Sequence, residues 1–329
     1  PPLDWSQMDD SPYIEMAISF ESDELIYWTK VVALGLVGAV TVHTVYRLYK
    51  HPEQRRALAG ILGVQYCIGH AVFPSSSPLH LPLHSVTRLN RNVSRFRFRL
   101  PSHDNILGVP PGQHVAVTAE VEGKRVTRMY SPVTANDVTG FADFVIKRYD
   151  TPRALSKYIH SLKVESTMEM SGPRGHIAYK GRGKFVVGRG EKKETRTAST
   201  ISMIAGGTGI TPFMQIIQKC LEDKHDISHL NLLFANSTEE DVFLKDVLDS
   251  FTEVYGARIN IEYTVSRVNE ATSRWKGNIG RVDSPLILRC IPSPSSNHIL
   301  LVCGPNPMVK ACISALEECG HATHSILVF

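Results

Sequence analysis

The chain has few cysteines for its length and none of the spacings that mark a metal site or a disulfide framework. Six cysteines occur in 329 residues, and no two of them form a CxxC pair or a zinc-ligand pattern. Disulfide-dependent secreted domains and zinc modules need dense or closely spaced cysteines. The composition therefore predicts free thiols in a reducing compartment and no bound metal.

A strong charge imbalance is absent as well. The formal net charge is +4, and the basic residues are not gathered into the stripes with interleaved aromatic residues that nucleic-acid surfaces carry. A modest positive charge suits the steering of an acidic protein partner. With 43% hydrophobic and 21% charged residues, the chain is globular rather than disordered, and it is long enough for two domains.

One long stretch near the N-terminus is apolar enough to cross a bilayer. Residues 26–49 contain few polar groups and carry Tyr27, Trp28, Tyr46 and Tyr49 at the two ends, where amphipathic rings favour the headgroup layer. Acidic residues precede this stretch and basic residues follow it, so the positive-inside rule places the rest of the chain in the cytosol or the mitochondrial matrix. We therefore expect a transmembrane helix over residues 26–49, after an N-terminal segment of residues 1–25.

Residues 50–78 follow as a juxtamembrane linker that contains a second, shorter apolar run, residues 57–73. This run is an interfacial helix or a second span, and we favour a single span because glycines and polar residues interrupt the run. The chain begins with Pro1-Pro2 rather than methionine; removal of a mitochondrial presequence and an incomplete sequence each explain this.

A glycine-rich segment, Gly206-Gly207-Thr208-Gly209-Ile210-Thr211, follows an apolar run and precedes a helical pattern that starts at Pro212. A strand that turns through glycines into a helix presents free backbone N–H groups and the positive end of the helix dipole. This arrangement suits a phosphate-bearing ligand, although many such turns serve only to pack a helix against a sheet.

Two further motifs indicate a nucleotide cofactor. Arg128-Met129-Tyr130-Ser131 combines a guanidinium for phosphate, a ring for stacking and a hydroxyl for a heteroaromatic nitrogen, which together suit a flavin. Cys303-Gly304-Pro305-Asn306-Pro307-Met308 follows an apolar run, at the carboxyl end of a predicted parallel strand, where open α/β sheets bind ligands. Taken alone, Cys303 would be interpreted as a packing residue.

From about Leu79 to Phe329 these motifs resemble the NADH-cytochrome b5 reductase family of ferredoxin reductase-like flavoenzymes, as do Gly112-Gln113-His114 and Gly172-Pro173-Arg174-Gly175. The resemblance implies a six-stranded antiparallel β-barrel that binds FAD, over residues 79–181. After a basic linker, residues 182–198, it implies an α/β Rossmann-like domain that binds NADH or NADPH, over residues 199–329. Alternating apolar and polar runs in the first domain, and alternating strand and helix patterns in the second, agree with this division.

The resemblance also assigns roles to residues. Ser131 would lie at the reactive edge of the flavin, His114 would relay a proton through it, and Cys303 would lie near the nicotinamide, which makes these three the predicted catalytic residues. Phe329 would close the pocket. The predicted cofactor contacts are Arg128, Met129, Tyr130, Ser131, Val145, Lys147, Ala154, Leu155, Ser156, Gly206, Gly207, Thr208, Gly209, Thr211, Pro212, Ser266, Arg267, Cys303, Gly304, Pro305, Met308 and Phe329.

The sequence departs from the family in two places. A Gly-Lys-Met-Ser-like motif usually receives the FAD pyrophosphate, and here Arg153-Ala154-Leu155-Ser156 stands in its place. We expect Thr151 to cap this helix, Pro152 to be its first residue and Arg153 to supply the missing charge. Ser266-Arg267 stands where relatives that prefer NADH carry an aspartate. We therefore expect NADH as the coenzyme and keep NADPH as a strong alternative.

The sequence thus predicts a membrane-anchored flavoprotein of the mitochondrial or endoplasmic reticulum membrane. It would take a hydride from NADH and pass electrons to cytochrome b5 or a similar acidic haem protein. The altered pyrophosphate motif and the two apolar segments leave an alternative open. In that alternative the chain is an accessory or structural subunit of a larger membrane redox complex, with little turnover.

Overall fold

The computed structural model describes residues 69–268 and 275–329, which belong to one compact unit that begins at Cys67. The predicted transmembrane helix, residues 26–49, lies outside these residues, as does most of the second apolar run. In the two described ranges, no helix has both the length and the apolar character that a membrane crossing requires.

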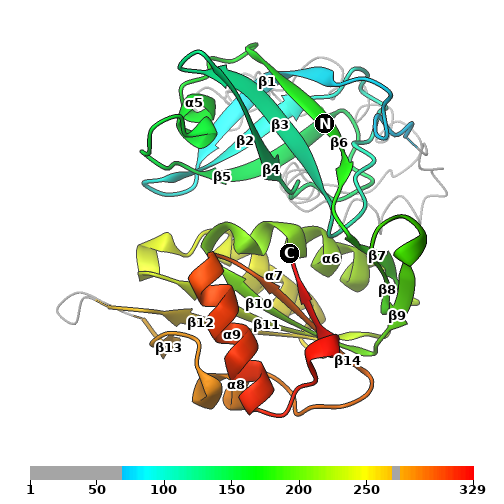
Figure 1. The fold of residues 1–329 in the computed structure, drawn as a ribbon, viewed down its shortest axis with the longest axis vertical. Coiled ribbons are helices and arrows are strands. Elements are labelled where there is room, and N and C mark those ends of the chain that lie inside the picture. Colours follow the sequence, from blue (N-terminus) through cyan, green and yellow to red (C-terminus); the bar gives the residue numbers. More distant parts are fainter. Residues whose placement is uncertain (1–68, 269–274) are drawn as a thin grey trace, which may run out of the picture. The chain divides into compact units, whose positions relative to one another are not determined.

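The first lobe is a six-stranded antiparallel sheet with strand order β4-β3-β6-β1-β2-β5 (Figure 1). Its strands are β1 (Leu79–Arg88), β2 (Val93–Arg99), β3 (His114–Val121), β4 (Lys124–Tyr130), β5 (Phe141–Lys147) and β6 (Thr167–Arg174), with a short helix, α5 (Leu155–His160). Past the end of β4 the chain approaches the other edge strand, β5, with an isolated bridge between Pro132 and Phe144 and a hydrogen bond from the Val133 N–H to the Asp143 carbonyl at 2.9 Å. The predicted six antiparallel strands are confirmed, as a half-barrel rather than a fully hydrogen-bonded barrel.

Strand β2 shows how the period-two pattern builds this lobe. Phe96 and Phe98 point into the core and are almost completely buried, whereas the arginines between them face outward. Arg97 lies opposite Asp143 of β5 and donates two hydrogen bonds to its carboxylate, of 2.8 and 2.9 Å. The outer face of the sheet is thus held by a cross-strand ion pair and the inner face by aromatic packing.

A small sheet of β7 (Ile177–Gly181), β8 (Lys184–Val187) and β9 (Glu194–Thr197) follows, with the 3₁₀ turn η2 (Gly190–Lys192) before β9. The segment predicted as a linker, residues 182–198, is therefore folded into strands. Within it, Phe185 and Val187 of β8 are buried, whereas Lys184 is exposed.

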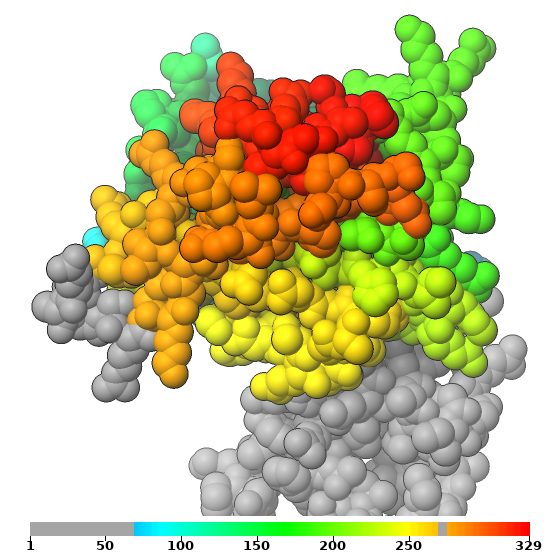
Figure 2. All heavy atoms as spheres, turned by 90° about the horizontal axis from the view of Figure 1, so that it is seen from below, coloured from blue at the N-terminus to red at the C-terminus, as the bar shows by residue number. Residues whose placement is uncertain are grey.

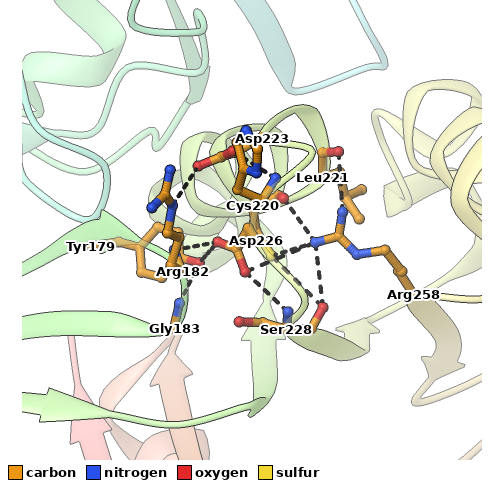
Figure 3. A network of polar contacts seen from close by, with 10 residues as sticks. Tyr179, Arg182, Gly183, Cys220, Leu221, Asp223, Asp226, Ser228 and Arg258 are labelled. Atoms are coloured by element: carbon orange, nitrogen blue, oxygen red, sulfur yellow. Dashed lines mark hydrogen bonds and ion pairs between the residues drawn. The ribbon is translucent and has the colours of Figure 1, made fainter.

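A buried carboxylate fastens this small sheet to the second lobe (Figure 3). Asp226, 1% exposed, accepts hydrogen bonds from the Tyr179 hydroxyl of β7 and from the backbone N–H groups of Arg182 (2.5 Å) and Ser228 (3.0 Å). Arg258 forms an ion pair with it at 3.9 Å. Burial raises the pKa of Asp226, but the hydrogen bonds from Tyr179 and Ser228 outweigh that effect and lower it. The carboxylate is therefore charged and stabilised where three segments meet.

The second lobe is a parallel sheet with strand order β13-β12-β11-β10-β14-β15. Its strands are β10 (Thr200–Gly206), β11 (His229–Asn236), β12 (Ile259–Val265), β13 (Asn278–Ile279), β14 (His298–Cys303) and β15 (Ile326–Val328). The helices are α6 (Thr211–Glu222), α7 (Lys245–Tyr255), α8 (Ser284–Cys290) and α9 (Asn306–Glu318), with 3₁₀ turns η3 (Gly207–Ile210), η4 (Glu239–Asp241) and η5 (Thr323–Ser325). The predicted α/β domain is confirmed.

Helices cover both faces of this sheet, as the alternation of its buried residues requires. Met203 packs in one core cluster with residues of α6 and α7, whereas its neighbour Ile204 packs in another with residues of α8 and α9. Helices α8 and α9 lie against each other at the surface, orange to red in Figure 2. The turns and loops that follow the carboxyl ends of β10, β11, β12 and β14 form one side of the site.

Candidate active site

A single cleft of about 1150 Å³ collects almost all of the residues singled out from the sequence. One wall comes from β3, β4, β5 and the start of α5, and the other from the loops after β10, β11, β12 and β14 together with the C-terminus. Of the predicted site residues, only Arg267 does not line this cleft. Residues more than 200 positions apart are thus brought to one surface, although their individual roles remain predictions.

The glycine-rich turn takes its shape from two different constraints. Gly207 has a φ of +53° and open space around it, so its conformation rather than its packing favours glycine. At Gly209, a Cβ atom would lie 2.3 Å from the backbone oxygen of Cys303, which no side chain tolerates. The turn passes through η3 into α6, which begins at Thr211 with Pro212 in its first turn, so the predicted strand-turn-helix order is confirmed.

The Arg128–Ser131 motif occupies the end of edge strand β4 and the residue after it. The Arg128 side chain is exposed and donates a 2.8 Å hydrogen bond to the Thr127 carbonyl, and Met129 is half exposed. Burial raises the pKa of Tyr130 to about 12, so its hydroxyl stays neutral and its ring forms part of the cleft wall. A cation, an aromatic ring and a free hydroxyl therefore follow one another along the wall.

The helix start near residue 153 differs from the prediction. The cap residue is Ala154 and helix α5 begins at Leu155, so the expectation that Thr151 caps the helix and Pro152 opens it is wrong. The reason is that Arg153 has a φ of +54°, which ends the preceding turn, and the N–H of Ala154 donates back to the Thr151 carbonyl at 3.2 Å. Arg153, Ala154, Leu155 and Ser156 still line the cleft.

His114 and Lys147 also face the cleft. Burial lowers the pKa of His114, and the positive charges of His176, Arg174 and Arg189 lower it further, so the imidazole is neutral near pH 7. Among the described residues no hydrogen bond joins His114 to Ser131, and the proton relay stays a prediction. Lys147 pairs with Asp241 of η4 at 3.5 Å.

Cys303 ends β14 beside the glycine-rich turn. Burial raises the pKa of its thiol to about 12, so the thiol is protonated and is no nucleophile at neutral pH. The C-terminal Phe329 donates its backbone N–H to the Val302 carbonyl at 3.0 Å and packs edge-on against Phe213, with ring centroids 5.3 Å apart. Phe329 lines the cleft, as does Cys303, and its closing role stays a prediction.

Comparisons with known proteins identify the family. Residues 80–179 match the oxidoreductase FAD-binding domain and residues 203–313 the oxidoreductase NAD-binding domain. NADH-cytochrome b5 reductase 3 of Mus musculus is 38% identical over 253 residues, covering 73% of this chain and 83% of the relative. The Rattus norvegicus protein of the same name is 36% identical over 286 residues, 80% of this chain and 94% of the relative. The chain belongs to the NADH-cytochrome b5 reductase family.

A solved structure agrees with this assignment. The cytochrome b5 reductase domain of Ulva prolifera nitrate reductase is 31% identical, with a TM-score of 0.73, and the match covers 79% of this chain and all of that one. The protein is therefore an oxidoreductase with FAD-binding and NAD-binding domains, and its cofactors are FAD and NADH.

The residues of this cytochrome b5 reductase family member fit the FAD cofactor. Arg128, Arg153 and Lys147 place three cations along the wall that would receive phosphate, Tyr130 offers a ring and Ser131 a hydroxyl. The pyrophosphate of FAD would thus lie against cations, and its flavin ring would lie against the Tyr130 ring and the Ser131 hydroxyl. The lysine that the family motif carries is absent, and Arg153 is the cation that lies nearest to it in sequence.

Several residues that line the cleft were not predicted from the sequence, above all Arg281. This residue follows β13, whose two residues pair with the end of β12, so Gly280 and Arg281 lie beside Ser266. Strand β13 is too short to show a periodic pattern, and its pairing partner is not evident from the sequence. Asn236 and Ser237 also line the cleft and were not predicted. They lie at the carboxyl end of a strand that was predicted correctly, and that location could have indicated a place in the site.

Proposed function

We propose that this protein takes a hydride from NADH into FAD and delivers single electrons to cytochrome b5 or a similar acidic haem protein at a membrane. When bound, FAD supplies the conversion of a two-electron donor into one-electron steps. The protein's own part is to hold the two cofactors in line and to orient the acceptor.

The observation that carries this proposal is the shared cleft. Gln215 of α6 donates hydrogen bonds to the Thr134 carbonyl at 2.7 Å and to Asn136 Oδ1 at 3.0 Å, which ties the helix after the glycine-rich turn to the segment after Ser131. The predicted flavin wall and the predicted nicotinamide wall are thereby fixed against each other. Hydride transfer depends on such alignment more than on any reactive side chain.

The chemistry of the side chains supports transfer rather than covalent catalysis. The neutral thiol of Cys303 fills space beside the nicotinamide position without competing as a nucleophile. The Ser131 hydroxyl is a donor at the position proposed for the flavin edge, and the neutral His114 imidazole is able to accept a proton there.

A second, basic pocket supports the acceptor half of the proposal. It has a volume of about 410 Å³, is lined by Lys180, Arg189 and Lys193, and shares Gly175 and His176 with the main cleft. An acidic surface docked over these cations would approach the flavin from the outside. The positive charges that act on His114 belong to the same region.

The membrane part of the proposal rests on residues 26–49, and we place the anchor in the mitochondrial or endoplasmic reticulum membrane. The accessory-subunit alternative is motivated by the changed pyrophosphate motif at Arg153. It predicts tight retention in a larger complex and little turnover.

The test is steady-state reduction of cytochrome b5 by the full-length, detergent-solubilised protein with NADH. We expect rapid reduction that slows as salt rises, and a reduction rate about 10-fold lower when Lys180 and Lys193 are both changed to glutamate. Flavin reduction by NADH, measured separately, should be unchanged in that variant. No cytochrome reduction despite full FAD occupancy would support the accessory subunit instead.

A further inference from the structure

The part of the cleft around Ser266 carries a charge pattern that concerns the coenzyme. Because β12 lies three strands from β14 in the sheet order, Ser266 is about 14 Å from Cys303 at the usual spacing of about 4.8 Å per strand. A dinucleotide that has its nicotinamide near Cys303 and its pyrophosphate at the glycine-rich turn would place its adenosine ribose in this region. What surrounds Ser266 therefore determines how the ribose 2′ position is recognised.

Backbone pairing brings Arg281 to this position. Val265 lies opposite Ile279, the Gly280 N–H donates to the Val265 carbonyl at 2.9 Å, and Thr264 Oγ1 donates to the Gly280 carbonyl at 2.9 Å. These bonds fix the chain immediately before Arg281 against the end of β12. Ser237, Ser266 and Arg281 then line the same end of the cleft.

Carboxylates that would repel a phosphate are engaged elsewhere. Asp241 is the only acidic residue among the described residues that line the cleft, and it pairs with Lys147 at 3.5 Å. Asp283 caps α8 by accepting the Leu286 N–H at 2.9 Å, and Glu262 accepts a hydrogen bond from Asn278 at 3.2 Å.

An acidic residue that binds the ribose 2′-OH is the usual mark of NAD recognition, whereas an arginine accommodates the 2′-phosphate of NADP. Arg281 and the two serine hydroxyls supply donors, and no lining carboxylate of the described part remains available for a 2′-OH. We propose that Arg281, with Ser266 and Ser237, forms a 2′-phosphate site that lets this chain use NADPH as well as NADH. This inference rests on the proposed function, since it concerns the coenzyme of the same cleft.

The site differs from the one that the sequence indicates. Arg267 follows Ser266 directly, but it does not line the cleft; its backbone N–H donates to the Ser237 carbonyl at 3.2 Å. The specificity residue is thus Arg281, which is 15 positions from Ser266 in sequence and adjacent to it through the β12–β13 pairing.

The first experiment measures binding without turnover. Adenosine 2′,5′-bisphosphate and 5′-AMP are titrated calorimetrically into the full-length, FAD-loaded protein. We expect the bisphosphate to bind about 10- to 100-fold more tightly, as an added charge-assisted contact would give, and Arg281→Ala to abolish that difference. Lys276→Ala is the matched control, because it removes an exposed positive charge from the same segment without touching the cleft lining.

The second experiment compares the coenzymes in flavin reduction by stopped flow. In the unchanged protein, we expect the rate of flavin reduction by NADPH to be within about 10-fold of the rate with NADH. Arg281→Ala should slow the reduction by NADPH at least 10-fold and the reduction by NADH less than twofold. Ser266→Asp should slow only the reduction by NADPH, because its carboxylate repels the 2′-phosphate. Equal binding of the two adenosine phosphates, together with an unchanged NADPH rate in Arg281→Ala, would overturn the 2′-phosphate site. If neither coenzyme reduced the flavin, the proposed function would fail, whereas the binding experiment would still decide the inference.

Discussion

Two turns of the same cleft contain a residue with nearly the same positive φ, but the residue types differ. Gly207 has a φ of +53° and Arg153 a φ of +54°, and both line the cleft. A left-handed conformation costs a non-glycine residue about 1–2 kcal/mol, so the chain accepts at one turn a strain that it avoids at the other. Glycine is therefore a preference, and not a requirement, wherever only φ opposes a side chain.

Packing imposes a stricter requirement within the glycine-rich turn itself. Gly209 has no room for a Cβ atom because the Cys303 carbonyl lies against it, whereas the space around Gly207 is open. The comparison thus separates glycines needed for the close approach of two backbone segments from glycines needed only for conformation. Three substitutions test this separation, and a fourth tests the neighbouring Cys303.

Gly209→Ala should have the largest effect. The added methyl group would lie 2.3 Å from a backbone oxygen, so η3 and the end of β14 must move apart, at a cost of about 3 kcal/mol or more in the free energy of unfolding. Urea denaturation of the FAD-loaded protein measures this cost. A loss below about 1 kcal/mol would contradict the packing requirement.

Cys303→Ala should slow flavin reduction by NADH about 10-fold, because the thiol positions the nicotinamide without reacting. The pKa of the thiol, about 12, lies above the working range, so the thiol stays protonated and the ratio of wild-type to variant rates should not change between pH 6 and 9. Stopped-flow absorbance over that range measures the ratio. A ratio that rises with pH would indicate a thiolate and refute the positioning role.

Gly207→Ala should cost about 1 kcal/mol, since only the positive φ opposes the methyl group. Thermal unfolding measured side by side with Gly209→Ala gives the comparison under identical conditions. If the two variants were equally destabilised, conformation and packing would not be separable at this turn.

Arg153→Gly should have the smallest effect on stability and the opposite sign. Relief of strain is partly offset by the greater freedom of glycine in the unfolded chain, which leaves a gain below about 1 kcal/mol. FAD affinity should fall about 10-fold because a phosphate-facing cation is lost. Arg153→Lys keeps the charge and should retain the affinity for FAD. If Arg153→Gly and Arg153→Lys bound FAD equally well, the charge of Arg153 would have no part in binding the phosphate.

The sequence predicts those parts of the fold that have a local pattern. The alternation around Phe96 and Phe98 and the apolar runs before Gly206 and Cys303 each correspond to an observed strand. Motifs at strand ends could be assigned to one cleft because parallel strands place their carboxyl ends along one edge. The resemblance to a family supplied the order of the two lobes.

Other features depend on contacts that no local pattern contains. Thr151 and Pro152 have the residue types of a helix start, yet the left-handed Arg153 moves the start to Leu155. Arg281 joins the cleft lining after the two-residue strand β13, which pairs with the end of β12, whereas the sequence indicated Arg267. Register and turn conformation, rather than residue type, decided both positions.

The central claim is that one cleft aligns the nicotinamide of the coenzyme with FAD. Anaerobic stopped-flow mixing of the full-length, FAD-loaded protein with NADH tests it most directly, with the flavin absorbance as the signal. We predict that the flavin band disappears within a second, at a rate that saturates with NADH concentration. A flavin band that NADH and NADPH both leave unchanged would contradict the account.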